Sequence, residues 1–274
     1  MIPFFEPPKL SLGPLTIYGF GVAVAMAIIF GAFMVRRRVI KLGLDPDLAS
    51  DLLYAVLGGG FIGAHLVDVL VYRPSALLDD PLLLFKIWNG ISSFGGFFGA
   101  LLGTYLFFRW KRVPRNERWG YYEALIYSLP FGWVFGRLGC FLAHDHPGIM
   151  TDFFLAVERP TRAFLLEHPD FPDGPFLDLG FLEMLYTILV VLLISFLDRR
   201  KRRPVGFYLT LIPAVYAPVR FGLDHFRWVD VRYFGLTPGQ YSAFALLGLA
   251  LFLWIRHPRG VHGFGKLACD NQPR

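Results

Sequence analysis

The stretch FGRLGCFLAHDHPG, residues 135–148, places a cation and several proton-transfer groups in and after an apolar run. Arg137 stands inside that run, and His144, Asp145 and His146 follow within ten residues. A guanidinium group binds phosphate through paired N–H donors, and an imidazole exchanges protons near neutral pH. The stretch therefore indicates a site for an anionic substrate at the end of a buried helix.

The chain around this stretch has the composition of an integral membrane protein. Of its 274 residues, 55% are hydrophobic and only 18% are charged, which is well outside the usage of soluble domains. Two runs, 17–35 and 91–108, contain no charged residue and no histidine, and each is about long enough to cross a bilayer as a helix. We predict a single all-α membrane domain of seven transmembrane helices, with the other five spans at 52–72, 121–142, 179–197, 207–226 and 236–255.

The basic residues alternate from one loop to the next. Most of the 27 lysines and arginines follow the first, third, fifth and seventh spans, as in the run RRKRR at 199–203. By the positive-inside rule these ends are cytoplasmic, so the N-terminus faces outward and the tail 256–274 lies inside. Membrane topology thus accounts for the net charge of +6, and no nucleic-acid partner is expected. The largest outward segment, 143–178, is rich in Pro, Asp and Gly, and we predict an irregular periplasmic cap there.

Further ionisable residues stand inside the predicted spans, where their energetic cost marks them as functional candidates. Counted from the cytoplasmic end of each span, Arg137 lies roughly 24 Å along its helix, and Arg220 and His65 lie roughly 20 Å along theirs. Asp68 follows His65 by three residues on the same helix face, and this spacing favours a buried pair over a catalytic dyad. Three helices are therefore predicted to bring charge to one level of the outer leaflet.

Aromatic and small residues reach the same level from the outer side. Tyr18 opens the first span, and Ser92, Ser93, Gly95 and Gly96 open the third. Small residues allow a backbone or a lipid headgroup to approach closely. An outward-facing pocket with two arginines near the headgroups indicates an anionic group such as phosphate.

These motifs resemble those of the bacterial prolipoprotein diacylglyceryl transferases. The segment GRLGCFLAHDHPG, 136–148, is similar to that family's signature, which begins Gly-Arg-(Leu/Ile)-Gly-(Asn/Cys)-Phe and ends in Gly. Four more stretches match in order: LGPLTIYGFG, GISSFGGFFGALLG, YAPVRFGLDHFR and GLTPGQ. The resemblance implies a multi-pass enzyme of the bacterial inner membrane that takes the diacylglyceryl group from phosphatidylglycerol in the lipid bilayer. It would pass that group to the lipobox cysteine of a prolipoprotein, forming a thioether and releasing glycerol phosphate.

The resemblance also implies roles for individual residues. Arg137 and Arg220 correspond to important arginines of the family, and they would stabilise charge on the leaving phosphate. Asp145 falls where many members carry Glu, and it could orient an arginine or act as a base. We expect no cofactor and no metal. The expected substrate-binding residues are Tyr18, His65, Ser93, Gly95, Gly96, Cys140, Gly148 and Tyr216.

Departures from the family pattern leave the base undecided. The family's Ser-Phe-His-Gly-Gly reads Ser-Ser-Phe-Gly-Gly at 92–96, so Phe94 replaces the usual histidine. Of the family motif His-Pro-Ser-Gln-Leu-Tyr-Glu, only Glu183 is recognisable. His144 or His146 could supply the missing imidazole, and we count both with Asp145 as catalytic candidates.

Three alternative functions remain open at this point. One is a family paralogue that modifies another acceptor. A second is a transporter or a membrane subunit without activity, although the two halves of the chain do not resemble each other as transporter repeats often do. A third is a metallohydrolase using His144, His146 and His225, for which two histidines spaced by one residue are a weak signal.

Overall fold

The computed structural model describes residues 1–256 apart from positions 14, 87–89, 91, 202 and 231, so the predicted tail lies almost wholly outside the described residues. The chain divides into two compact units, residues 1–38 with the part from 122 onward, and residues 39–121, which we describe separately. Most of the described chain is helical, and seven helices of at least 18 residues coincide with the seven predicted spans. Five of them are long and apolar enough to cross a membrane, so the protein is a helical membrane protein.

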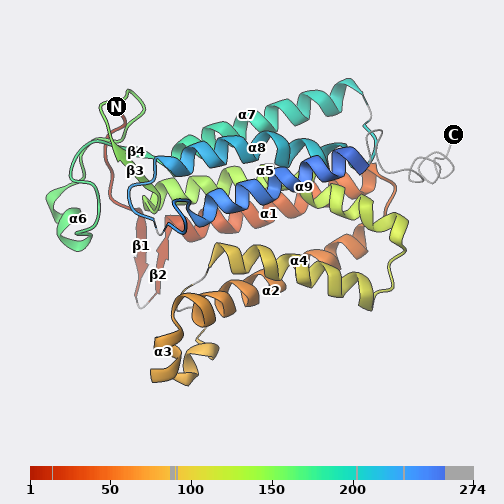
Figure 1. Ribbon diagram of the computed structural model, residues 1–274, viewed down its shortest axis with the longest axis horizontal. Coiled ribbons are helices and arrows are strands. Elements are labelled where there is room, and N and C mark those ends of the chain that lie inside the picture. Colours follow the sequence, from red (N-terminus) through yellow and green to blue (C-terminus); the bar gives the residue numbers. More distant parts are fainter. Residues whose placement is uncertain (14, 87–89, 91, 202, 231, 257–274) are drawn as a thin grey trace. The chain divides into compact units, whose positions relative to one another are not determined.

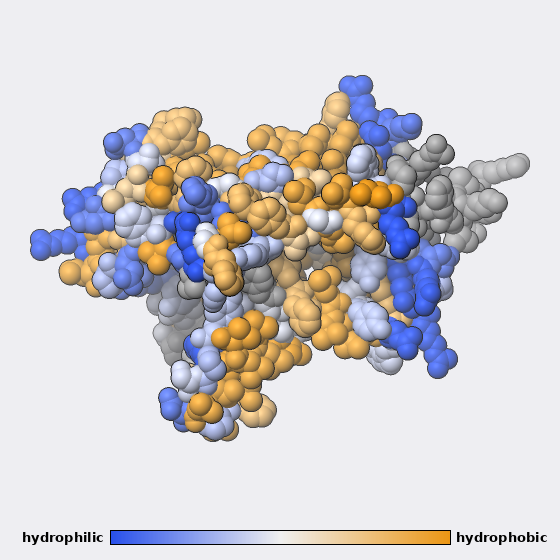
Figure 2. Space-filling view, in the orientation of Figure 1, coloured by the Kyte–Doolittle hydropathy of each residue, from blue (hydrophilic) through white to orange (hydrophobic). Residues whose placement is uncertain are grey.

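The first unit contains five long helices that run side by side (Figure 1). They are α1 (Gly19–Lys41), α5 (Arg115–Ala143), α7 (Leu179–Arg200), α8 (Phe207–His225) and α9 (Pro238–Arg256). The core that α1, α5, α7 and α8 share includes Met34, Phe131, Val190, Ile194 and Ile212. Figure 2 shows apolar side chains over the middle of α7, α8 and α9 and hydrophilic side chains toward the helix ends, as expected for helices in a bilayer.

A buried carboxylate fixes the start of α8. Glu123 of α5 accepts hydrogen bonds from three backbone N–H groups within 206–209, at 3.0–3.1 Å. These groups belong to the first turn of α8, where the helix itself supplies no acceptor. Arg38 of α1 lies 3.8 Å from Glu123 and donates to Asp198 of α7 at 2.8 Å. The network joins four helices, and it sets the register of α8 and thereby the position of Arg220.

The predicted irregular cap contains more regular structure than expected. Strand β3 (Pro147–Met150) pairs with strand β4 (Phe176–Asp178) in an antiparallel sheet, and helix α6 (Arg162–Glu167) lies between them in sequence. A second hairpin, β1 (Lys9–Leu12) and β2 (Leu15–Tyr18), precedes α1. The chain is still mostly helical, in agreement with the predicted all-α class, and the short strands were not predicted because isolated pairs of three or four residues leave little periodic signal.

The second unit is built on two closely packed helices, α2 (Pro46–Val67) and α4 (Ser93–Trp110). A Cβ atom added at Gly63 would lie 2.4 Å from the Gly95 carbonyl oxygen, and one added at Gly99 would lie 2.1 Å from that of Gly59. Backbones this close require glycine on both helices. Helix α2 begins six residues before the predicted span, since Asp45 caps it and Pro46 occupies its first position.

The chain between α2 and α4 consists of short helical segments. A π-helical turn, η1 (Asp68–Tyr72), continues α2 and is followed by α3 (Pro74–Asp79) and the 3-10 helix η2 (Pro81–Phe85). The π-helical turn η1 and the 3-10 helix η2 have a different number of residues per turn from an α-helix, so their side chains leave the helix axis in different directions. This change decides the partners of His65 and Asp68, described below.

Candidate active site

Glu183 of α7 holds two predicted site arginines at one carboxylate. Arg137 Nε of α5 lies 2.9 Å from Glu183 Oε1, and Arg220 Nη1 of α8 donates to Glu183 Oε2 at 2.8 Å. The Glu183 side chain is only 1% exposed, and those of Arg137 and Arg220 are 9% and 14% exposed. Low solvent access strengthens these charge interactions and fixes both guanidinium groups in place.

Two aromatic residues complete the surroundings of Glu183. Trp133 Nε1 donates to Glu183 Oε1 at 3.1 Å, and the Tyr216 hydroxyl donates to the same oxygen. The Arg137 guanidinium lies over the Trp133 ring, 4.6 Å from its centroid, in a cation–π contact. The carboxylate therefore has several fixed donors, and the guanidinium plane of Arg137 is held against an aromatic face.

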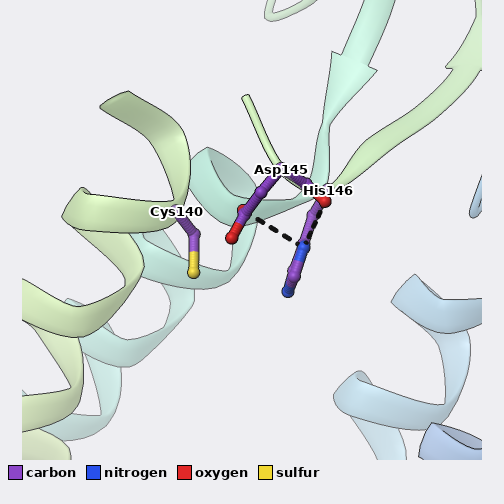
Figure 3. A group of neighbouring side chains, drawn as sticks. All are labelled: Cys140, Asp145 and His146. Carbon is purple, nitrogen blue, oxygen red and sulfur yellow. Dashed lines mark hydrogen bonds and ion pairs between the residues drawn. The ribbon is translucent and has the colours of Figure 1, made fainter. Parts of the chain in front are cut away.

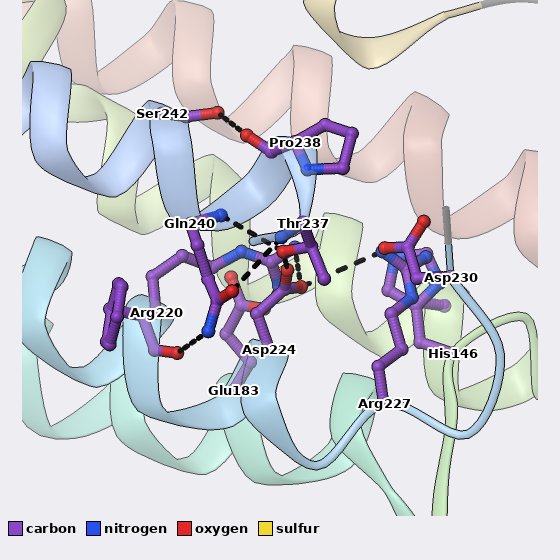
Figure 4. Close-up of polar contacts among 12 residues, drawn as sticks. His146, Glu183, Arg220, Asp224, Arg227, Asp230, Thr237, Pro238, Gln240 and Ser242 are labelled. Carbon is purple, nitrogen blue, oxygen red and sulfur yellow. Dashed lines mark hydrogen bonds and ion pairs between the residues drawn. The ribbon is translucent and has the colours of Figure 1, made fainter. Parts of the chain in front are cut away.

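Asp224 binds the other side of Arg220 (Figure 4). Arg220 Nη2 donates to Asp224 Oδ1 at 2.9 Å, and the Thr237 hydroxyl donates to Asp224 Oδ2. Gln240 Oε1 accepts from the Thr237 N–H at 3.0 Å, which closes the first turn of α9 around the contact. Arg227 Nη1 lies 3.7 Å from Asp224 Oδ1. The Arg220 guanidinium group is therefore held between Glu183 of α7 and Asp224 of α8, and Thr237, just before α9, holds the Asp224 carboxylate in place.

Helical spacing explains how one row of α8 contributes to this cluster. Tyr216, Arg220 and Asp224 are each four residues apart, as are Trp133 and Arg137 on α5. Residues at that spacing share a helix face. Sequence reasoning named Tyr216 and Arg220 but missed Asp224 and Trp133, although the same spacing, continued for one more turn on each helix, would have found both.

His144 is built into the fold by both of its ring nitrogens. The helix α5 ends at Ala143, and His144 adopts a left-handed backbone conformation with φ 49° that turns the chain. Its Nδ1 lies 2.8 Å from Asp178 Oδ2, and its Nε2 lies 3.2 Å from the Phe5 carbonyl oxygen. The side chains of His144 and Asp178 are fully buried, and burial raises the pKa of Asp178 above its usual range. His144 thus joins the N-terminal segment to the start of α7.

His146 and Asp145 stand at the end of α5 together with Cys140 (Figure 3). His146 Nδ1 lies 2.7 Å from the Asp145 carbonyl oxygen and 3.1 Å from Asp145 Oδ1. Arg137 Nη1 lies 3.6 Å from Cys140 Sγ, so the cluster adjoins the arginine site. Burial, reinforced by the nearby positive charges of Arg137 and Arg227, lowers the pKa of His146, although Asp145 opposes this. Burial also raises the pKa of Asp145.

The same three residues have the composition of a metal site. The ligand atoms of Cys140, Asp145 and His146 all lie within 4.8 Å of one another. The Arg137 guanidinium beside the thiol argues for an anion rather than a cation at this place, since a metal ion there would meet a fixed positive charge. In the alternative set proposed for a metallohydrolase, His144 has both nitrogens engaged. We therefore assign no metal ligands.

Tyr18 and Gly148 lie on two sides of the cluster. Tyr18 ends β2 and lines a cavity of about 610 Å³ together with Pro8, Leu142 and Asp145. Gly148 lies in β3, where an added Cβ would be 2.9 Å from the Leu177 carbonyl oxygen and 3.0 Å from that of Phe226. Gly148 therefore permits β3 to pass between β4 and the end of α8, which places His146 beside the arginine site.

The predicted pairing of His65 with Asp68, in the second unit, is wrong. His65 Nε2 lies 3.1 Å from the Leu83 carbonyl oxygen, and Asp68 binds Arg73 instead. The α-helical spacing that would align the two side chains ends at Val67, and Asp68 already belongs to the π-helical turn.

The small residues that open α4 also belong to this second unit. Gly95 makes room for the backbone of α2, whereas an added Cβ at Gly96 would meet only ordinary contacts at 3.7 Å or more. The side chains of Ser93 and Phe94 lie outside the described part of the chain. The predicted substrate-binding roles of Ser93, Gly95 and Gly96 remain predictions.

Comparison with known proteins gives a consistent result. Residues 7–256 match the family model described as prolipoprotein diacylglyceryl transferase. A protein of Photobacterium profundum named phosphatidylglycerol–prolipoprotein diacylglyceryl transferase is 33% identical over 262 residues, covering 92% of this chain and 94% of the relative. A protein of the same name from Chromohalobacter salexigens is 30% identical over 262 residues, with 93% and 94% covered. A third, from Vibrio parahaemolyticus, is 30% identical over 271 residues, with 95% and 94% covered.

Proposed function

Because this chain belongs to the prolipoprotein diacylglyceryl transferase family, we propose that it transfers the diacylglyceryl group of phosphatidylglycerol to the cysteine thiol of a prolipoprotein. The sulfur forms a bond to the terminal glyceryl carbon of the lipid, and the bond from that carbon to the phosphate oxygen breaks. The products are a thioether and glycerol phosphate. The acceptor is the lipobox cysteine of a secreted precursor.

The observation that carries this proposal is the pair of arginines on Glu183. Each guanidinium group has five N–H donors, and Glu183 and Asp224 use only some of them. The donors that remain could bind a phosphate, which guanidinium groups hold through paired hydrogen bonds. In the reaction, negative charge grows on the leaving phosphate oxygen, and fixed cations in a site of low solvent access stabilise that charge.

The membrane arrangement is part of the same proposal. Seven spans, with the N-terminus outside and the basic helix ends inside, place the arginines of α5 and α8 in the outer half of the inner membrane of a bacterium. The phosphate of a lipid in the outer leaflet lies at that level. A secreted precursor presents its cysteine on the same side.

Complementation tests this function directly. The chain is expressed in a bacterium depleted of its own diacylglyceryl transferase, and the thioether product is measured with labelled phosphatidylglycerol and a lipobox peptide. We expect the wild type to restore growth and transfer, and Arg137→Ala and Arg220→Ala each to abolish transfer while the protein still inserts in the membrane. Lysine at either position should restore only part of the activity, because it lacks the planar fork.

A matched arginine provides the control. Arg159 lies in the segment after β3, is 64% exposed, and pairs with Asp173 at 2.8 Å, so Arg159→Ala removes an exposed ion pair of little energetic weight. We expect this variant to transfer like the wild type. Full activity in Arg137→Ala or Arg220→Ala would disprove the phosphate-binding role, and a wild type that yields no thioether would disprove the function.

A further inference from the structure

The proposed transfer requires a group that takes the proton of the acceptor thiol, and the inference below rests on that function. A free cysteine has a pKa near 8.5, so most acceptor molecules are protonated at pH 7. The thiolate is the nucleophile, and a base within hydrogen-bond reach accelerates its formation. Position 94, where the resembling family carries histidine, is a phenylalanine with no proton acceptor.

We infer that Nε2 of His146 accepts this proton, with Asp145 as the residue that orients the ring. The Asp145 carbonyl oxygen lies 2.7 Å from His146 Nδ1, and a carbonyl oxygen only accepts hydrogen bonds. His146 Nδ1 therefore carries the hydrogen, and Asp145 Oδ1 at 3.1 Å supports the same tautomer. The lone pair of the neutral imidazole is then on Nε2, for which no described residue provides a hydrogen-bond partner.

The other groups at this end of α5 are less suited to the task. His144 has its Nδ1 on Asp178 and its Nε2 on the Phe5 carbonyl oxygen, so neither nitrogen is available to a substrate. Cys140 is itself a thiol and lies against Arg137. The Asp145 carboxylate is already directed at His146 Nδ1.

The position of His146 matches the path of the reaction. Its ring lies within 4.8 Å of Cys140 Sγ, which is in turn 3.6 Å from Arg137 Nη1. An acceptor thiol beside His146 would thus lie next to Arg137, the arginine proposed to bind the phosphate. The thiol proton passes to Nε2 as the carbon–sulfur bond forms, and the bonding electrons of the broken carbon–oxygen bond leave with glycerol phosphate.

The charged groups around His146 favour its neutral form. It faces Asp145 from its own segment, Arg137 from α5 and Arg227 from the segment after α8, and burial together with both arginines lowers its pKa. A base with a lowered pKa is unprotonated over a wider range at low pH. The transfer rate should therefore reach its plateau below the ordinary histidine pKa of about 6.5, rather than rising between pH 6 and 7 as an unperturbed histidine would require.

The pH dependence of transfer in single variants tests this inference. At pH 7 we expect His146→Ala to transfer about 100-fold more slowly than the wild type, the lower end of the range for general base catalysis. The deficit should shrink as the pH passes about 8.5, because the acceptor thiol then ionises without help. Added imidazole should restore part of the rate at pH 7. Asp145→Asn should keep a measurable rate with an altered pH profile.

Two other histidines serve as controls. His168 is exposed, and its Nδ1 contacts the Phe164 carbonyl oxygen at 3.1 Å, which is the same tautomer arrangement away from the cluster, so His168→Ala should match the wild type. His144→Ala should lower thermal stability, since it leaves Asp178 buried without its partner, but the protein that remains folded should keep the wild-type pH profile.

Two results would overturn the assignment. One is a His146→Ala variant with the rate and pH profile of the wild type, and the other is loss of transfer in Asp145→Asn alone, which would make Asp145 the base. Either result leaves the proposed function intact, because the wild type still transfers. A wild type that releases no glycerol phosphate at any pH would instead overturn the proposed function and this inference with it.

Discussion

Arg220 Nη2 donates to Asp224 Oδ1 at 2.9 Å, one turn further along α8. Asp224 is fully buried, and its second oxygen is occupied by the Thr237 hydroxyl. Arg220 therefore depends for its orientation on a carboxylate that contacts the arginine from the side opposite Glu183. The contact also ties the arginine to the first turn of α9, a helix that supplies none of the predicted site residues.

A glycine pair on α9 tests this dependence. A Cβ atom added at Gly239 would lie 2.7 Å from Asp224 Oδ2, whereas one added at Gly248 would meet nothing within 4 Å. We expect Gly239→Ala to displace the carboxylate and reduce transfer by about 10-fold or more, the effect of 1.4 kcal/mol in the barrier. Gly248→Ala should leave transfer unchanged. Asp224→Asn should resemble Gly239→Ala, and equal activity in all three variants would show that Arg220 needs no support from Asp224.

A second glycine pair tests the packing of α2 against α4. A Cβ atom at Gly63 would lie 2.4 Å from the Gly95 carbonyl oxygen, whereas one at Gly58 would meet nothing within 4 Å. We expect Gly63→Ala to force the helices apart at a cost of about 1–3 kcal/mol, as overpacking of a filled interior does. Gly58→Ala should be neutral or slightly stabilising, since alanine favours a helix. Thermal unfolding of the purified protein in detergent measures both variants, and equal midpoints would contradict the close packing.

The third prediction concerns orientation in the membrane. The basic residues near Lys41, Arg118 and Arg203 should lie on the cytoplasmic side. Reporter domains fused after each of these residues should therefore all report cytoplasm, and a fusion within the 143–178 segment should report the periplasm. A periplasmic signal from any of the first three positions would contradict the seven-span arrangement.

The long helices could be predicted from the sequence because apolar length is a local property. The predicted and observed bounds of the last three differ by no more than three residues at either end, and the larger differences have local causes such as the Asp45 cap on α2. Arg137 and Arg220 stood out as charges within apolar runs. A charged residue in an apolar run can be recognised without knowing which acid it pairs with.

The contacts that orient those arginines could not be predicted in the same way, although the spacing on α8 pointed to Asp224 as a candidate. Glu183 lies on α7, Asp224 lies on α8 and Thr237 directly precedes α9, so only the packing of the bundle brings their oxygens to the same place. For His65 and Asp68 the sequence predicted a contact that the structure does not contain. The three-residue spacing assumed an unbroken α-helix where the chain forms a π-helical turn. His144 and His146 looked equivalent in the sequence, and in the structure they differ in burial and in what their ring nitrogens contact.

The ion pairs around Asp224 and Glu183 have a consequence for turnover. Three arginines, Arg137, Arg220 and Arg227, are balanced by three carboxylates, Glu183, Asp224 and Asp230. The charges of these six side chains thus cancel, and a phosphate that binds the arginines must share them with acids already in place. Such sharing limits how tightly a dianionic product is retained. We expect the carboxylates to recapture the guanidinium groups as glycerol phosphate departs, so that the residues that hold the arginines for catalysis also hasten product release.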